Sequence, residues 1–187
     1  MIDIPDRFQN VTEGESILNF AYGSNMLRGR LEKRVGGIRK VGVAYLPDYR
    51  LRANKISDDG SSKANIEPYA GGRVWGVLWS VPVAEREGLD SAEGYSPVRR
   101  NNHYEPHLVT VYDVNGKPMD AMAYIACEGR TTEEDFPMYV WYHRFLMLGA
   151  EENGLTKEYM DEIDRLPKID DGDRTRHLRN MRITMEQ

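Results

Sequence analysis

The chain has 187 residues, 40% of them hydrophobic and 29% charged, which is the composition of a soluble globular protein with one domain. Its 30 acidic residues outnumber its 25 basic residues, and the net charge of −5 argues against a protein that binds nucleic acid through a basic surface. No apolar run is long enough to cross a membrane, no secretory signal opens the chain, and the single cysteine cannot form an internal disulfide, so we expect a cytoplasmic protein without membrane or nucleic-acid partners.

The first predicted element is a buried strand over residues 17–22. It breaks at Gly23, and Ser24 and Asn25, which favour helix N-caps, lead into a predicted helix over residues 26–35. A junction of this kind gathers free backbone N–H groups and the positive end of a helix dipole, so it can receive a carboxylate or another oxyanion. The alternative is that it only connects two elements.

Three segments follow before the clearest strand. Residues 41–46 and 49–52 read as short strands, with a turn at Pro47-Asp48 between them. Residues 54–72 are rich in Asn, Asp, Ser and Gly, and we predict a long loop there.

Residues 73–81 are predicted to form a strand because their apolar residues alternate. The alternation places four of them on one face, where we expect core packing: Trp75, Val77, Trp79 and Val81. Gly76, between the two tryptophans, can let another backbone approach closely.

A short helix is predicted from Pro82 to Glu93, with Gly94 as its stop. Leu89 and Glu93 share one face, so burial of Leu89 would place the Glu93 carboxylate at the edge of the core. A carboxylate in that position is partly desolvated and gains nothing from the helix dipole, which suits a general base at neutral pH. The alternative is that Glu93 points into water.

Residues 95–102 are predicted to form a polar loop, whose Arg99 and Arg100 are candidates to meet an acidic substrate, although exposure to solvent is the simpler interpretation. The best hairpin signal in the chain follows this loop. Two alternating segments flank the preferred two-residue turn Asn115-Gly116, namely residues 108–114 and 119–126.

The last predicted elements are two helices. The first covers residues 137–148 and closes at Gly149, and the second follows Thr156, which is a good N-cap. The ends of the chain, residues 1–15 and 167–187, are polar or charged. We predict a loose arm and a partly disordered surface extension, respectively.

Metal binding is not expected. His103, Glu105 and His107 would share a face of a strand, but no helical His-Glu-x-x-His motif and no cysteine cluster accompany them. Residues 170–173 resemble part of a calcium loop but lack its closing glutamate, so we interpret them as a solvated turn. The sequence also lacks a phosphate loop and the Gly-x-Ser-x-Gly motif of serine hydrolases.

Four blocks, taken in order, resemble the gamma-glutamylcyclotransferase family: Tyr22-Gly23-Ser24-Asn25-Met26, Val74-Trp75-Gly76-Val77-Leu78-Trp79, Leu89-Asp90-Ser91-Ala92-Glu93-Gly94 and Gly149-Ala150-Glu151-Glu152-Asn153-Gly154-Leu155. Chance rarely supplies all four, and the resemblance runs from about Phe20 to about Leu166. It implies an α+β fold in which helices surround a small mixed β-barrel. It also implies a core over about residues 16–166 and no metal or cofactor.

The resemblance further implies roles for nine residues. Glu93 corresponds to the catalytic glutamate of the family. The substrate-binding residues it implies are the loop residues Tyr22, Gly23, Ser24, Asn25 and Met26 and the pocket tyrosines Tyr104, Tyr124 and Tyr142. The partner is then a small-molecule gamma-glutamyl substrate, and a homodimer stays open as the assembly.

The implied reaction converts a gamma-glutamyl amide into 5-oxoproline and a free amine, which makes the enzyme a carbon–nitrogen lyase of the acyl-transfer type. Residues 95–103 are longer and more basic than the family leads us to expect, and residues 54–72 do not match closely, so the leaving amine stays open. The leaving group can be an amino acid, another amine or a biosynthetic intermediate. The rival classes are a non-catalytic binding module and an interaction protein that acts through its charged tail.

Overall fold

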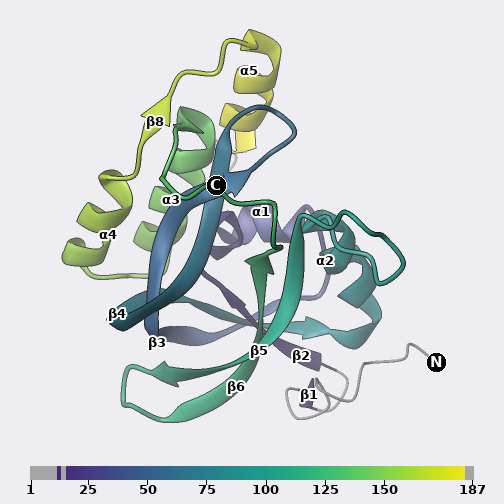
Figure 1. Cartoon of the computed structure of the whole chain (residues 1–187). Helices are drawn as coiled ribbons and strands as arrows, with labels where there is room; N and C mark the ends of the chain where they lie inside the picture. Colours follow the sequence, from purple (N-terminus) through teal and green to yellow (C-terminus); the bar gives the residue numbers. More distant parts are fainter. Residues whose placement is uncertain (1–11, 14–15, 184–187) are drawn as a thin grey trace.

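The fold is a closed barrel of five strands, as the computed structural model shows for residues 12–13 and 16–183 (Figure 1). The strands are β2 (Ser16–Ala21), β3 (Arg39–Ile56), β4 (Ser62–Pro82), β5 (Tyr104–Asp113) and β6 (Pro118–Ala126), and β1 (Thr12–Glu13) extends the sheet beside β2. Their order is β1-β2-β4-β3-β5-β6, and β2 also pairs with β6 in parallel, which closes the barrel. Because the other pairs are antiparallel, the predicted mixed barrel is confirmed.

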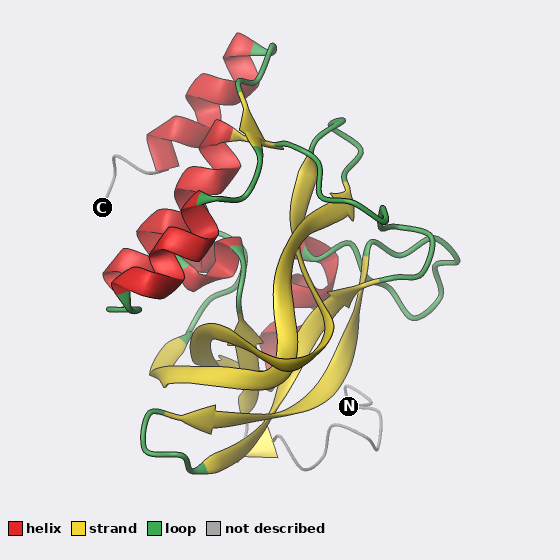
Figure 2. Cartoon of the chain, turned by 60° about the vertical axis from the view of Figure 1, so that its left-hand side comes forward, coloured by secondary structure: helices red, strands yellow, loops and turns green. Residues whose placement is uncertain are grey.

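Helices surround the barrel. The larger ones, α3 (Val140–Glu152), α4 (Lys157–Asp164) and α5 (Arg174–Ile183), group on one side of the long β3–β4 hairpin (Figure 2). The shorter ones are η2 (Ser24–Met26), α1 (Arg28–Glu32), η3 (Val83–Glu85) and α2 (Arg86–Ala92), and α2 lies on the other side of that hairpin (Figure 1). No helix among the described residues is long and apolar enough to span a membrane.

The core reaches both faces of β4. The predicted face is buried at Val77, Trp79 and Val81, whereas Trp75 is only half-buried. Val74 and Leu78 on the opposite face are also buried. One face of a barrel strand points inward, so burial of both faces means that other elements cover the outside. Gly76 allows the close approach that the sequence predicts, because a Cβ atom there would lie 2.4 Å from the carbonyl oxygen of Ala21 on β2.

The predicted loop over residues 54–72 is wrong, because residues 62–82 form β4 and residues 39–56 form β3. Asn54 and Asn65, which the composition assigns to a loop, are buried side chains joined by a 3.1 Å hydrogen bond. Asn65 also accepts a 3.0 Å hydrogen bond from the backbone N–H of Ala126. Polar side chains with such partners are stable inside a sheet. A polar composition therefore does not distinguish this part of the sheet from a loop.

Two predicted turns differ in detail. The chain does not turn at Pro47-Asp48 but continues through a bulge in β3, where Asp48 has a φ of 59° and its carboxylate accepts the N–H of Gly71. The predicted β5–β6 hairpin is confirmed, but residues 114–117 connect its strands instead of a two-residue turn. The Asp113 carboxylate accepts the N–H groups of Asn115 and Lys117 and stabilises this longer turn.

The helix predictions are partly confirmed. The predicted helix over 26–35 is shorter, because η2 precedes it and α1 ends at Glu32. The predicted helix over 137–148 begins at Val140, since residues 138–139 form β7 (Met138–Tyr139). It also does not close at Gly149 as predicted but continues to Glu152. The predictions for the other two helices are confirmed: residues 83–92 form η3 and α2, and the Thr156 side chain accepts the N–H of Tyr159 at the start of α4.

The charged C-terminal segment is an ordered part of the fold up to residue 183. Strand β8 (Lys168–Ile169) pairs in parallel with β7, and α5 follows on the surface with none of its residues buried. Asp171 does not sit in a solvated turn as predicted: its buried carboxylate accepts hydrogen bonds from Trp141 at 2.8 Å and Arg176 at 2.6 Å. The last predicted residues of this extension, 184–187, and most of the 1–15 arm lie outside the described residues.

We expect Asp171→Asn to destabilise the protein at pH 7 by about 2 kcal/mol, the scale of a hydrogen-bonded charge. The Arg176 guanidinium and the Trp141 N–H hold the pKa of Asp171 well below its usual range. The carboxylate therefore stabilises the fold above the ordinary carboxyl pKa, and this contribution is lost as the pH falls. Denaturant unfolding at pH 7 and pH 3 measures it. The exposed neighbour Asp170→Asn is the control, and equal stability of the two variants at pH 7 would contradict the prediction.

Candidate active site

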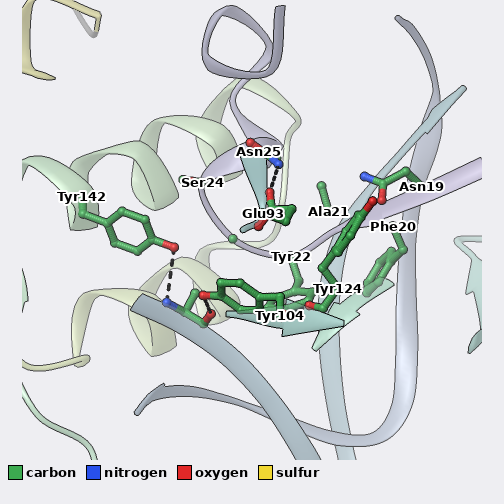
Figure 3. A pocket seen from close by; sticks show the side chains of 12 residues that line it. Asn19, Phe20, Ala21, Tyr22, Ser24, Asn25, Glu93, Tyr104, Tyr124 and Tyr142 are labelled. Carbon is green, nitrogen blue, oxygen red and sulfur yellow. Dashed lines mark hydrogen bonds between the residues drawn. The ribbon is translucent and has the colours of Figure 1, made fainter. Parts of the chain in front are cut away.

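A pocket opens where β2 ends and η2 begins. It is lined by Asn19, Phe20, Ala21, Tyr22, Gly23, Ser24, Asn25, Ala64, Glu93, Tyr104, Tyr124 and Tyr142. Figure 3 shows Tyr142 reaching in from α3, Asn25 meeting Glu93, and Tyr104 lying opposite them. The structure thus brings together every predicted site residue except Met26, whose fully buried side chain does not line the pocket.

Side chains from other elements donate hydrogen bonds to backbone carbonyls of the loop from Tyr22 to Met26. The Trp79 indole N–H donates to the carbonyl of Asn25 at 3.0 Å, and the Asn153 amide donates to the carbonyl of Met26 at 3.0 Å. Ser24 and Asn25 do not cap a helix as predicted, since neither η2 nor α1 has a side-chain cap. Their side chains are therefore free of that role and line the pocket.

Helix α3 packs unusually closely against this loop at Gly149. A Cβ atom at position 149 would lie 2.7 Å from the backbone nitrogen of Leu27 and 2.8 Å from the Cβ of Met26. Contacts that short do not occur for real side chains, so only glycine permits this spacing. The glycine of the Gly149-Ala150 block therefore helps to place the loop.

Glu93 ends α2 and turns inward. Its N–H continues the helix to the carbonyl of Leu89, whose side chain is fully buried. The Glu93 carboxylate is 15% exposed and accepts hydrogen bonds from Asn25 at 2.6 Å and Arg34 at 3.1 Å. The alternative that Glu93 points into water is therefore wrong, and the placement at the edge of the core is confirmed.

Arg34 is a site residue that the sequence does not single out. One nitrogen of its guanidinium donates to Glu93 at 3.1 Å and to the Asn25 side-chain oxygen at 2.9 Å. It joins the loop to α2 across 59 positions of sequence. The only local signal is its place beside the apolar stripe Leu27, Leu31 and Val35. That stripe predicts burial of the helix but not the partner of the arginine.

The four pocket tyrosines are hydrogen-bonded and neutral. Burial raises the pKa of Tyr22, Tyr104, Tyr124 and Tyr142, so each keeps its proton near neutral pH. Tyr22 donates to the carbonyl of Tyr124, and Tyr104 donates to that of Ala64 at 2.7 Å. Tyr142 accepts the N–H of Ala64 at 3.3 Å (Figure 3). These side chains can bind and orient a ligand, but none is charged to act as a base.

Among the described residues that line the pocket, Glu93 is therefore the one carboxylate, and it lies among tyrosines that keep their protons. The pocket also contains an unsatisfied acceptor, because the side-chain oxygen of the buried Asn19 has no hydrogen-bond partner in the described part of the chain. Asn19, Phe20, Ala21 and Ala64 line the pocket without having been predicted. Ala64 lies in β4, within the segment that the composition predicts to be a loop.

The proposed His103, Glu105 and His107 face does not form. His103 lies 2.8 Å from the Lys55 ammonium and 3.3 Å from Asp58, whereas Glu105 and His107 are exposed along β5. Over residues 12–13 and 16–183, no three His, Cys, Asp or Glu side chains gather closely enough to hold a metal ion.

Comparison with known proteins gives three findings. The model of the AIG2-like family matches residues 73–163. The chain is 32% identical to gamma-glutamylcyclotransferase of Bos taurus, and the match covers 84% of this chain and 82% of that protein. It is 31% identical to the Mus musculus protein of the same name, and that match covers 81% of this chain and 79% of that protein. A solved structure of a gamma-glutamyl cyclotransferase superposes with a TM-score of 0.74 at 29% identity, covering 83% of this chain and 90% of that one.

Proposed function

Because this chain belongs to the gamma-glutamylcyclotransferase family, we propose that it converts gamma-glutamyl amides into 5-oxoproline and a free amine. The observation that supports this proposal is that Glu93 is the single carboxylate among the described residues that line a pocket of neutral tyrosines. An intramolecular cyclisation needs a folded substrate and a proton relay, and it needs no protein nucleophile.

The chemistry balances with one carboxylate. The α-amine of the glutamyl group attacks its own γ-carbonyl carbon, a new C–N bond closes the five-membered ring, and the C–N bond to the leaving amine breaks. Two protons leave the attacking nitrogen and two arrive on the departing nitrogen, so an ionised Glu93 can accept and return them in turn. No water is consumed.

The remaining pocket residues then serve as binding groups. The Tyr22–Met26 loop would donate hydrogen bonds to oxygen atoms of the glutamyl group, where negative charge develops. The unpaired oxygen of Asn19 is suited to accept a hydrogen bond from the substrate α-ammonium. The neutral tyrosine hydroxyls complete the pocket and keep the Glu93 carboxylate as the proton acceptor.

The test is a comparison of gamma-glutamylalanine with its isomer α-glutamylalanine. We expect 5-oxoproline and alanine from the gamma isomer alone. Only in that isomer does attack of the free α-amine on the scissile carbonyl close a five-membered ring. Calorimetry on the same ligands separates the rival class. Tight binding of the gamma isomer without any product would indicate a binding module and would contradict the proposal.

Arg34→Gln should lower kcat about 10- to 100-fold, because it removes the cation that orients both Asn25 and the Glu93 carboxylate. Arg34→Lys should recover part of the loss, since lysine restores the charge without the planar guanidinium. Steady-state kinetics measure this effect. Arg28→Gln, which removes an exposed arginine paired with Glu32, is the control. An unchanged kcat in Arg34→Gln would show that the ion pair does not position the base.

A further inference from the structure

A second cavity of about 260 Å³ adjoins the pocket at Glu93. It shares Ser24, Glu93, Tyr104 and Tyr142 with the pocket. We call it the basic vestibule, because the other charged and imidazole side chains that line it are Arg30, Arg34, Lys55, Lys63, Arg99 and His103. Glu93 is its one carboxylate among the described residues, in a chain whose net charge is −5.

Two of these cations have a carboxylate partner. Arg34 pairs with Glu93, and Lys63 pairs with Asp59 at 2.8 Å. In the described part of the chain, no such partner lies within 4.0 Å of Arg30 or Lys55. Lys55 is nonetheless withdrawn from water, with 3% of it exposed, and Arg30 is half-buried with its Nε atom buried and without a hydrogen-bond partner.

The surroundings of Lys55 and Arg30 do not replace an anion. The Lys55 ammonium contacts the His103 ring at 2.8 Å and lies over the Tyr104 ring, while Arg30 lies over the Phe145 ring at 4.4 Å. Burial and the nearby Lys63 lower the pKa of Lys55 to about 8, a sign that its charge is held at an energetic cost. An anion in the vestibule would relieve both the desolvation and the repulsion among the cations.

The position of Glu93 determines which part of a substrate enters the vestibule. In the proposed reaction the scissile amide lies beside Glu93, and the glutamyl group fills the pocket lined by Tyr22 and Gly23. The leaving amine then projects past Glu93 into the adjoining vestibule, which Arg30 and Lys55 line. An α-carboxylate on the leaving group would neutralise one of these cations and leave the other without a partner.

We infer, on the basis of the proposed function, that the vestibule selects gamma-glutamyl conjugates whose leaving amine carries two anionic groups, as a dicarboxylic amino acid does. Arg30 and Lys55 bind the two groups, and Lys63 strengthens the local positive potential. Cations in a recessed site of low dielectric attract anions more strongly than surface cations do. The protein therefore acts on an acidic conjugate in preference to a neutral one of the same shape.

The test compares gamma-glutamylglutamate with gamma-glutamylglutamine, whose leaving groups have nearly the same shape and differ by one charge. At low ionic strength we expect kcat/KM to be at least about 10-fold higher for the glutamate conjugate, which is the scale of one charge-assisted hydrogen bond. The ratio should fall as salt is added, because screening weakens the attraction. Equal values for the two conjugates at low salt would overturn the inference.

Variants assign the preference to the vestibule. Lys55→Gln and Arg30→Gln should each bring the ratio close to one, whereas Lys117→Gln, which removes an exposed lysine at the far end of the β5–β6 hairpin, should leave it unchanged. A ratio that survives both vestibule substitutions would contradict the assignment. If a variant does not fold, a wild-type ratio that does not fall with added salt would contradict the electrostatic preference. Absence of 5-oxoproline from every conjugate, including gamma-glutamylalanine, would instead remove the proposed function and this inference with it.

Discussion

Glu93→Gln should reduce 5-oxoproline release by between about 10² and 10⁴-fold, the range that general acid–base catalysis contributes. The amide of glutamine has the same shape as the carboxylate, so its oxygen can still accept hydrogen bonds from Asn25 and Arg34. It cannot take a proton from the substrate. The variant should therefore fold normally and bind a gamma-glutamyl ligand while losing turnover.

The matched control is Glu87→Gln, because Glu87 belongs to the same helix, α2, but is exposed. Both variants lose one negative charge from that helix, so only the loss of the base distinguishes them. Initial rates with gamma-glutamylalanine, together with thermal unfolding of each variant, give the comparison. Wild-type turnover in Glu93→Gln would show that another group moves the proton.

Gly149→Ala should lower kcat/KM about 10- to 100-fold through the position of the loop rather than through the chemistry. The new methyl group would meet the backbone of Leu27 at 2.7 Å, so α3 and the segment after η2 must move apart. A shift of this size displaces Asn25 from Glu93, and small displacements in an active site have large effects on rate. Overpacking should also destabilise the protein by about 1–3 kcal/mol.

Gly88→Ala separates this steric effect from helix propensity. Gly88 also lies inside a helix, but a Cβ atom there would meet its nearest neighbours, the carbonyl of Arg34 and the Val35 side chain, at an ordinary 3.5 Å. Alanine at position 88 should stabilise the protein by up to about 1 kcal/mol and preserve turnover. If Gly149→Ala behaves in the same way, the close packing of α3 does not position the loop.

The predictions that depend on local chemistry succeed where the side chain itself carries the signal. Thr156 caps α4 because its hydroxyl can reach an N–H three residues ahead, and Gly76 is required where two strands approach closely. Glu93 is found by its spacing from Leu89, which predicts burial of one helix face. The barrel is predicted by the family resemblance and not by these local patterns, and the order of its strands is a finding of the structure.

Three of the failures share one cause, which is a partner far away in the sequence. Asn54 and Asn65 resemble loop residues until Thr132 and Ala126 supply their hydrogen bonds. Residues 138–139 continue a helical pattern, but they form β7 because β8 lies beside them. Arg34 likewise acquires a role only when α2 brings Glu93 to it. Such contacts cannot be read from the spacing of residues within one element.

The reaction of gamma-glutamylalanine in water labelled with oxygen-18 tests the central claim most directly, because cyclisation consumes no water. Mass spectrometry of the products after complete turnover gives the answer. We predict unlabelled 5-oxoproline and an equal amount of alanine. Glutamate that carries oxygen-18 in its side-chain carboxylate would show that water attacks the γ-carbonyl, and it would contradict an intramolecular reaction assisted by Glu93.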